Sequence, residues 1–145
     1  MMFAAFLLAT ATIVPAGESF QCVPTKVWDA DGPIWCSNGV RIRLAGIAAR
    51  EIDETCRRGH PCPEASGIEA RDYLISLLGT RGRATPHGHI TVSASATLSC
   101  TSTGNADGSR TGAWCYSPIA GDLSCAMVRS GYAARWDRYW GSHRC

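Results

Sequence analysis

The stretch Val40-Arg41-Ile42-Arg43-Leu44-Ala45-Gly46-Ile47-Ala48-Ala49-Arg50-Glu51 decides both the fold and the candidate site of this chain. Its first part alternates apolar and polar residues, which is the pattern of a half-buried β-strand. Arg41 and Arg43 are two residues apart, so they leave such a strand on the same face. Guanidinium groups bind planar oxyanions, and Glu51, beyond the glycine bend, is a candidate base. The stretch therefore predicts a strand that carries cations toward a carboxylate.

Turn residues divide the rest of the chain into short elements. Hydrophobic runs predict five strands, at residues 20–28, 34–38, 40–47, 90–100 and 111–117. A helix opens at Pro63 and Glu64 and ends at Gly79, and a second helix runs from Asp122 to Gly131. The first helix has a candidate buried face made of Ile68, Ala70, Leu74, Ile75 and Leu78. Five strands with a helix between the third and the fourth, and a helix near the C-terminus, predict a mainly β, α+β protein with an OB-type five-stranded barrel.

Several motifs resemble one known family. Asp29-Ala30-Asp31, then Asn38 to Ile47, then Glu51, resembles the staphylococcal nuclease (thermonuclease) pattern Asp-Gly-Asp-Thr followed by Arg-Leu-x-Gly-Ile-Asp-Ala-Pro-Glu. Gly108-Ser109-Arg110 resembles the Tyr-Gly-Arg segment of that family, and residues 122–133 resemble the helix that precedes its last substrate contacts. The resemblance extends from Val23 to Tyr139. It implies an OB-fold domain at residues 20–145 that hydrolyses phosphodiester bonds of DNA or RNA.

The resemblance also implies roles for single residues. Arg43 and Arg110 take the places of the two phosphate-binding arginines, and Glu51 takes the place of the carboxylate that activates water. Asp31 matches the first metal-binding aspartate. Tyr139 matches a tyrosine that packs near the nucleotide, with Trp136 and Trp140 as further stacking candidates. The alternative for Arg43 is a purely structural role, in an ion pair with Glu51 or Asp31. Arg41 is expected at the surface.

One departure concerns the metal. The second metal-binding aspartate of the family is replaced by Ala48, and a hard divalent cation such as calcium prefers several charged oxygen ligands. Asp29, Asp53 or Glu54 are candidates to replace the missing carboxylate. Arg50 is the alternative, supplying positive charge where the cation would lie. The resemblance therefore implies a divalent cation held with an incomplete ligand set.

Cysteine usage and the N-terminus predict export. Residues 1–16, with a boundary as late as residue 21, suit a signal peptide; an N-terminal anchor or a wrong start codon is the alternative. Eight cysteines follow it: Cys22, Cys36, Cys56, Cys62, Cys100, Cys115, Cys125 and Cys145. They allow 105 pairings. We predict closure between neighbours in sequence, in an oxidising compartment, either secreted or periplasmic. A zinc site at Cys56, His60 and Cys62, or at His87 and His89, is the rival interpretation, and we expect no zinc.

Charge is unevenly distributed. The formal net charge is +2, but from Arg81 onward seven arginines face only three aspartates. An Arg-rich surface favours recognition of phosphate, although a biased genome composition produces the same enrichment. The histidines are expected on exposed loops.

The sequence leaves three candidate functions. They are an exported phosphodiesterase, an OB-fold module that binds nucleic acid or another polyanion without cleaving it, and a disulfide-linked secreted domain with a protein partner. We expect a monomer with no stable membrane insertion after removal of the signal peptide.

Overall fold

A computed structural model describes residues 12–145, so the first eleven residues of the predicted signal peptide lie outside the described residues. The strands are β1 Ser19–Cys22, β2 Pro24–Val27, β3 Ile34–Cys36, β4 Arg41–Leu44, β5 Ile47–Ala48, β6 Gly79–Ala84, β7 Ile90–Ala94, β8 Leu98–Asn105, β9 Thr111–Ser117, β10 Gly121–Asp122 and β11 Ala134–Arg135. The helices are α1 Gly67–Leu78, α2 Leu123–Arg129 and α3 Asp137–Trp140. The protein is therefore mainly β with helices, as predicted.

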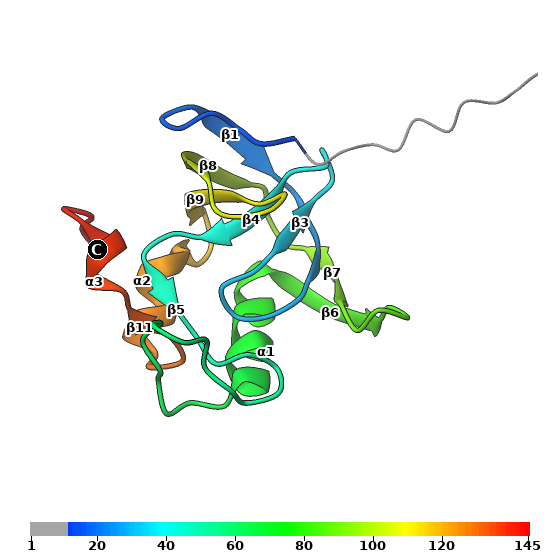
Figure 1. The fold of residues 1–145 in the computed structure, drawn as a ribbon. Helices are drawn as coiled ribbons and strands as arrows, with labels where there is room; N and C mark the ends of the chain where they lie inside the picture. Colours follow the sequence, from blue (N-terminus) through cyan, green and yellow to red (C-terminus); the bar gives the residue numbers. More distant parts are fainter. Residues whose placement is uncertain (1–11) are drawn as a thin grey trace, which may run out of the picture.

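The main sheet is curled and open, as Figure 1 shows. Its strand order is β1-β8-β9-β4-β3-β2-β7-β6, and β10 pairs with β9. All neighbouring strands are antiparallel except β4 and β9, which are parallel. The curl has a simple cause: β1 and β2 are separated only by Val23, yet β1 pairs with β8 and β2 pairs with β7. A second, two-stranded sheet joins β5 to β11.

The strands differ in number and length from the five expected. The strand expected at 20–28 is interrupted at Val23, and the strand expected at 90–100 is two strands, β7 and β8, because residues 95–97 leave the extended pairing. β6 was not predicted at all. Nearly all of its residues are exposed, so it lacks the apolar alternation that identifies a strand from sequence.

The core lies between the curled sheet and the two longer helices. β4 follows its predicted alternation, because Ile42 and Leu44 are fully buried while Arg41 and Arg43 lie on the other face. α1 packs against β2, β6 and β7, and α2 packs against β9. The buried face of α1 contains the predicted residues with one exception: Ile68 is 42% exposed and was wrongly assigned to the core.

The helix ends show how local signals and distant contacts combine. α2 begins as predicted, since the Asp122 side chain accepts a hydrogen bond from the backbone N–H of Cys125. α1 begins later than predicted, after the N-cap Ser66 instead of at Pro63. The carboxylate of Glu54 accepts hydrogen bonds from the Ser66 hydroxyl (2.8 Å) and the Gly67 N–H (2.8 Å), so a distant loop fixes where this helix starts.

All four predicted disulfides are present. They join Cys22 to Cys36, Cys56 to Cys62, Cys100 to Cys115 and Cys125 to Cys145. The bond between Cys56 and Cys62 uses both sulfurs that the rival zinc site at those residues requires. Four disulfides indicate an oxidising environment, extracellular or periplasmic. Among residues 12–145, no helix has the length and apolar character needed to cross a bilayer.

Candidate functional site

The turn between β2 and β3 places two aspartates beside β4. Within it, the N–H of Gly32 donates to the backbone carbonyl (3.2 Å) and to the side-chain Oδ1 (3.1 Å) of Asp29. The N–H of Leu44 donates to the carbonyl of Asp31 (2.8 Å) and so ties the turn to β4. Gly32 has a φ of +114°, and a Cβ atom there would collide with the Ile42 carbonyl. A glycine is therefore required for the turn to approach β4 this closely.

Arg43 reaches from β4 into the space beside this turn. Its guanidinium donates to the carbonyl oxygens of Leu44 (2.9 Å) and Ile47 (3.0 Å) and to Oδ2 of Asp31 (3.3 Å). The side chain is only 15% exposed. The ion pair with Asp31, one of the two partners in the alternative structural interpretation of Arg43, is present. It holds the guanidinium in place without using all five of its donors.

Three carboxyl groups converge next to Arg43. The buried carboxyl of Asp29 forms side-chain hydrogen bonds with both Asp31 and Glu51. Burial, and then the negative charges of Asp31 and Glu51, raise the pKa of Asp29 to about 10. Asp29 consequently holds a proton at neutral pH. Glu51 is more open, with 31% of its side chain exposed and its Oε1 3.6 Å from Nε of Arg57.

The predicted catalytic residues meet around one small cavity. Its volume is about 220 Å³, and its lining includes Asp29, Asp31, Arg43, Glu51 and Arg110. Arg110 arrives from the tight turn between β8 and β9, where its side chain donates to the carbonyl of Ala106 (3.1 Å). Residues that are distant in sequence thus share one surface.

A larger cavity of about 500 Å³ adjoins the first, because Arg43, Arg57, His60 and Arg110 line both. Tyr139 lines only the larger one, together with Trp136. The two rings meet edge to face, with centroids 4.7 Å apart, and Tyr139 is 54% exposed. Trp140 is buried in the core, so it is not a stacking platform.

Sequence analysis missed the loop that the Cys56–Cys62 disulfide closes. This loop brings Arg57 and His60 to both cavities. His60, expected to be exposed, is half-buried, with its ring centroid 4.3 Å from that of Trp136. Burial, and then the positive charge of Arg43, lower the pKa of His60, which keeps its imidazole neutral at pH 7. The sequence signal for this loop was the short separation of 6 between Cys56 and Cys62, a few residues after Glu51.

Ala48 leaves the site without a carboxylate at that position. It is fully buried and pairs with Ala134 across the small sheet of β5 and β11. Asp29, one of the four candidates to compensate for it, lines the smaller cavity.

The other three candidates make local contacts elsewhere. Arg50 donates to the carbonyls of Pro63 (2.8 Å) and Glu54 (2.8 Å). Asp53 accepts from the N–H (3.0 Å) and the hydroxyl (2.6 Å) of Thr55. Glu54 caps α1. Arg50, Asp53 and Glu54 therefore have structural partners, and none of them lines either cavity.

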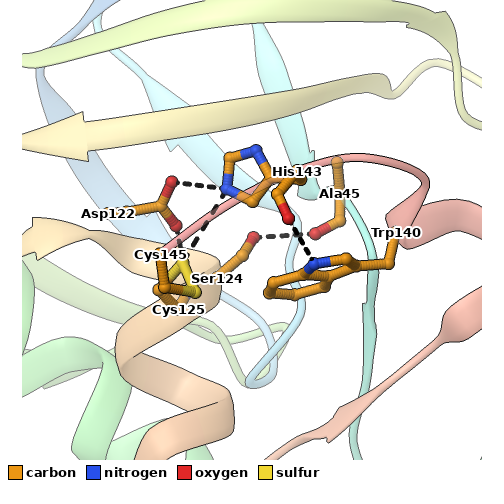
Figure 2. The surroundings of a disulfide bond; sticks show 7 residues. All are labelled: Ala45, Asp122, Ser124, Cys125, Trp140, His143 and Cys145. Atoms are coloured by element: carbon orange, nitrogen blue, oxygen red, sulfur yellow. Dashed lines mark hydrogen bonds and ion pairs between the residues drawn. A yellow bond between two sulfur atoms is a disulfide. The ribbon is translucent and has the colours of Figure 1, made fainter.

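A second group of potential metal ligands lies near the C-terminus. Figure 2 shows Asp122, Cys125 and His143 close together, with Nε2 of His143 2.7 Å from Oδ2 of Asp122. The sulfur of Cys125 is bonded to that of Cys145. A disulfide sulfur is not a thiolate, so this cluster is a structural contact between the C-terminal tail and α2.

The site combines two fixed cations, three neighbouring carboxyl groups and an aromatic wall. Such an arrangement can bind an oxyanion and place a carboxylate beside it. Neither a protein-family model, a curated protein nor a solved structure matches this chain.

Proposed function

We propose that this protein is an exported, thermonuclease-like phosphodiesterase that hydrolyses phosphodiester bonds of nucleic acid. The observation that carries the proposal is the convergence of Arg43, Arg110 and Glu51 around the smaller cavity. These residues come from a strand, a hairpin turn and a loop. Their meeting supports the roles that the resemblance implies.

Phosphodiester hydrolysis needs positive charge against the phosphate as negative charge develops on its oxygens. Arg43 and Arg110 supply it, and Arg43 is held by carbonyl groups before the substrate binds, so little reorganisation is needed. Glu51 accepts the proton of the attacking water as the water oxygen bonds to phosphorus. The P–O bond to the leaving nucleoside oxygen breaks, and that oxygen takes a proton from solvent water. Arg57, whose Nε lies 3.6 Å from Oε1 of Glu51, contributes a third cation to the site.

The carboxyl groups also suit a divalent cation. Asp29, Asp31 and Glu51 together offer the oxygen donors that calcium prefers, and Asp29 replaces the carboxylate lost at Ala48. A bound cation supplies Lewis-acid polarisation of the phosphate. The proton held by Asp29 is expected without a cation, because three adjacent carboxylates cannot all be charged. Tyr139 and Trp136 form the wall against which the nucleotide packs.

The fold we propose is an OB-type barrel. The parallel pairing of β4 with β9 supports it, as does the way in which one continuous segment, β1 followed by β2, pairs with both β8 and β7. α1 lies between the third and fourth strands of such a barrel. The disulfides support export, with residues 1–16 as the signal peptide.

The test is cleavage of single-stranded DNA and RNA by the mature protein with calcium, magnesium or a chelator. We expect cleavage that is lost in Glu51→Gln and retained in Glu64→Gln, an exposed glutamate outside both cavities. Ala48 favours a second candidate, a module that binds nucleic acid or another polyanion without cleaving it. Binding that weakens with salt, with no cleavage in any metal, would establish that second function and exclude the first.

A further inference from the structure

A row of three side chains crosses the sheet beside the candidate site. Lys26 of β2, Trp35 of β3 and Arg41 of β4 are paired neighbours in the sheet register. Nζ of Lys26 lies 4.0 Å from the centroid of the Trp35 ring, and Cζ of Arg41 lies 3.9 Å from it. β2 and β4 flank β3 on opposite sides, so each neighbouring strand brings one cation to the same indole ring. The indole therefore orients the two charges.

Neither cation is neutralised by an acidic partner. The ion pairs found within residues 12–145 include neither Lys26 nor Arg41. Arg41 donates from Nη1 to the Ser109 hydroxyl (2.9 Å), and its buried Nε has no partner among the described residues. A guanidinium has five donors, so most of the donors of Arg41 remain available. The row thus offers two held positive charges to an anion.

The row is continuous with the smaller cavity. Arg43 is two residues beyond Arg41 on β4 and shares its face. Trp28 directly follows β2, Pro33 directly precedes β3, and the Trp28 N–H donates to the Pro33 carbonyl (3.2 Å), so Trp28, Pro33 and Arg43 form a second row beside the first. Those three residues line the cavity. Two residues along a strand span about 7 Å. His89 bridges the rows, with its ring centroid 5.1 Å from Trp28 and 5.5 Å from Trp35.

We propose that the row of Lys26, Trp35 and Arg41 is a second phosphate-binding subsite, occupied by a neighbouring phosphate of the strand that enters the cavity. This inference rests on the proposed function and narrows its substrate to single-stranded polynucleotides. Lys26 and Arg41 bind the phosphate, and Trp35 positions them.

A single strand fits this surface for two reasons. Arg43 is largely buried, so a phosphate must enter the cavity to meet it, and a flexible strand bends more easily than a duplex. The aromatic wall of Trp136 and Tyr139 stacks only unpaired bases.

The test uses the full mature chain with Glu51→Gln, so that binding is measured without turnover. Fluorescent dinucleotide and dodecathymidylate are titrated against this protein and against the same protein with Lys26→Gln and Arg41→Gln. We expect the preference for the dodecamer over the dinucleotide to fall about tenfold, and the slope of log K against log salt to fall by about 0.7, because one neutralised phosphate of a single strand is lost. Arg83→Gln with Arg129→Gln, two exposed arginines outside the row and both cavities, is the matched control.

The outcomes separate the two proposals. The subsite is excluded if the row variant and the control variant lose affinity equally, or if duplex DNA binds as tightly as the single strand. In either case, cleavage by the protein with Glu51 intact would still support the nuclease proposal. If no protein cleaves but the dodecamer preference depends on the row, the nuclease is excluded and the subsite stands. Heparin binding as tightly as the dodecamer would also overturn the assignment to nucleic acid. Lys26→Gln alone, at a half-buried position, repeats the test without disturbing Arg41.

Discussion

Arg43 and Asp31 form an ion pair, with Nη2 of the arginine 3.3 Å from Oδ2 of the aspartate, and both side chains are less than one-sixth exposed, at 15% and 13%. The same guanidinium is anchored by two carbonyl groups, and the same aspartate contacts Asp29. Arg43 therefore connects the proposed phosphate-binding part of the site to its cluster of carboxyl groups. A change at either residue alters both parts.

Arg43→Ala and Arg110→Ala should differ in stability but not in activity. Both remove positive charge from the cavity, so we expect kcat/KM for nucleic acid to fall by about 10²–10³-fold in each. Arg43→Ala also leaves buried acceptors without a donor and should lower the free energy of unfolding by about 1–3 kcal/mol. The Arg110 side chain bonds to carbonyls of its own turn. Arg110→Ala should therefore lower the free energy of unfolding by less than about 1 kcal/mol. Kinetics and urea unfolding measure the two effects.

Arg83→Ala is the control for those variants, because Arg83 is exposed on β6 and lines neither cavity. Full activity in Arg110→Ala would contradict the proposed role of the cavity in phosphate binding.

Asp29→Asn should stabilise the protein at neutral pH. In the folded state the pKa of Asp29 is raised to about 10, so folding requires this group to take up a proton between about pH 4 and pH 10, and stability falls as pH rises through that window. Asparagine needs no proton. Since one pKa unit corresponds to about 1.4 kcal/mol, we expect Asp29→Asn to raise the free energy of unfolding by about 1–4 kcal/mol at pH 7. This gain should vanish near pH 3, where Asp29 is protonated in both states. Thermal unfolding of both proteins across pH measures the difference.

Calcium provides a second readout for the same variant. A cation that binds only the folded state raises the melting temperature, so calcium should raise it in the original protein and not in Asp29→Asn. For the pH prediction, a stability gain of Asp29→Asn over the original protein that persists at pH 3 would contradict the protonated state assigned to Asp29.

Much of this structure is encoded locally. The alternation around Ile42 and Leu44 predicted β4 because burial of one face leaves a period of two in the sequence. Asp122 predicted the start of α2, because an N-cap acts within its own helical turn. The disulfides follow sequence order because each closes a short loop or hairpin.

The features that sequence reasoning missed depend on distant contacts. α1 begins after Ser66 because Glu54, twelve residues earlier, caps it. The burial of His60 depends on Trp136, far along the chain. Asp29 was only one of several candidates to replace the carboxylate missing at Ala48. Its position between Asp31 and Glu51 exists only because the turn between β2 and β3 meets the loop after β5, which the sequence does not reveal. Side chains that come together through tertiary folding leave no periodic signal.

Removing the Cys56–Cys62 disulfide should reduce activity more than stability. Its loop is short, with a sequence separation of 6, so Cys56→Ser with Cys62→Ser should cost about 2 kcal/mol in the free energy of unfolding. The loop carries Arg57 and His60, and its release should lower kcat/KM by about tenfold or more. Denaturation and cleavage assays below the melting temperature of both proteins give the comparison.

The matched control removes Cys22 and Cys36, which line neither cavity and close a longer loop with a separation of 14. This variant should lose about 3 kcal/mol but retain most of its activity. If activity followed stability equally in both variants, the loop would have no specific role in the site.

His143→Ala should loosen the C-terminal tail and, through it, the bend before Glu51. The His143 ring stacks on Trp114 with centroids 3.6 Å apart, pairs with Asp122, and its carbonyl accepts from the Trp140 indole (2.8 Å), as Figure 2 shows for the last two contacts. Trp114 and Trp140 enclose Gly46, which has a φ of +74°. We expect a loss of about 1–2 kcal/mol in the free energy of unfolding from the stacking and the hydrogen bond to Asp122.

His87→Ala is the matched control, because His87 is exposed and outside both cavities. Since Gly46 lies between β4, which carries Arg43, and the loop that carries Glu51, His143→Ala should also lower kcat several-fold with little change in KM. In the proposed function this bend positions Glu51 relative to the phosphate, whereas Arg43 and Arg110 remain anchored by their own carbonyl contacts. A stability loss with unchanged kcat, measured well below the melting temperature, would show that the tail stabilises the fold without positioning Glu51.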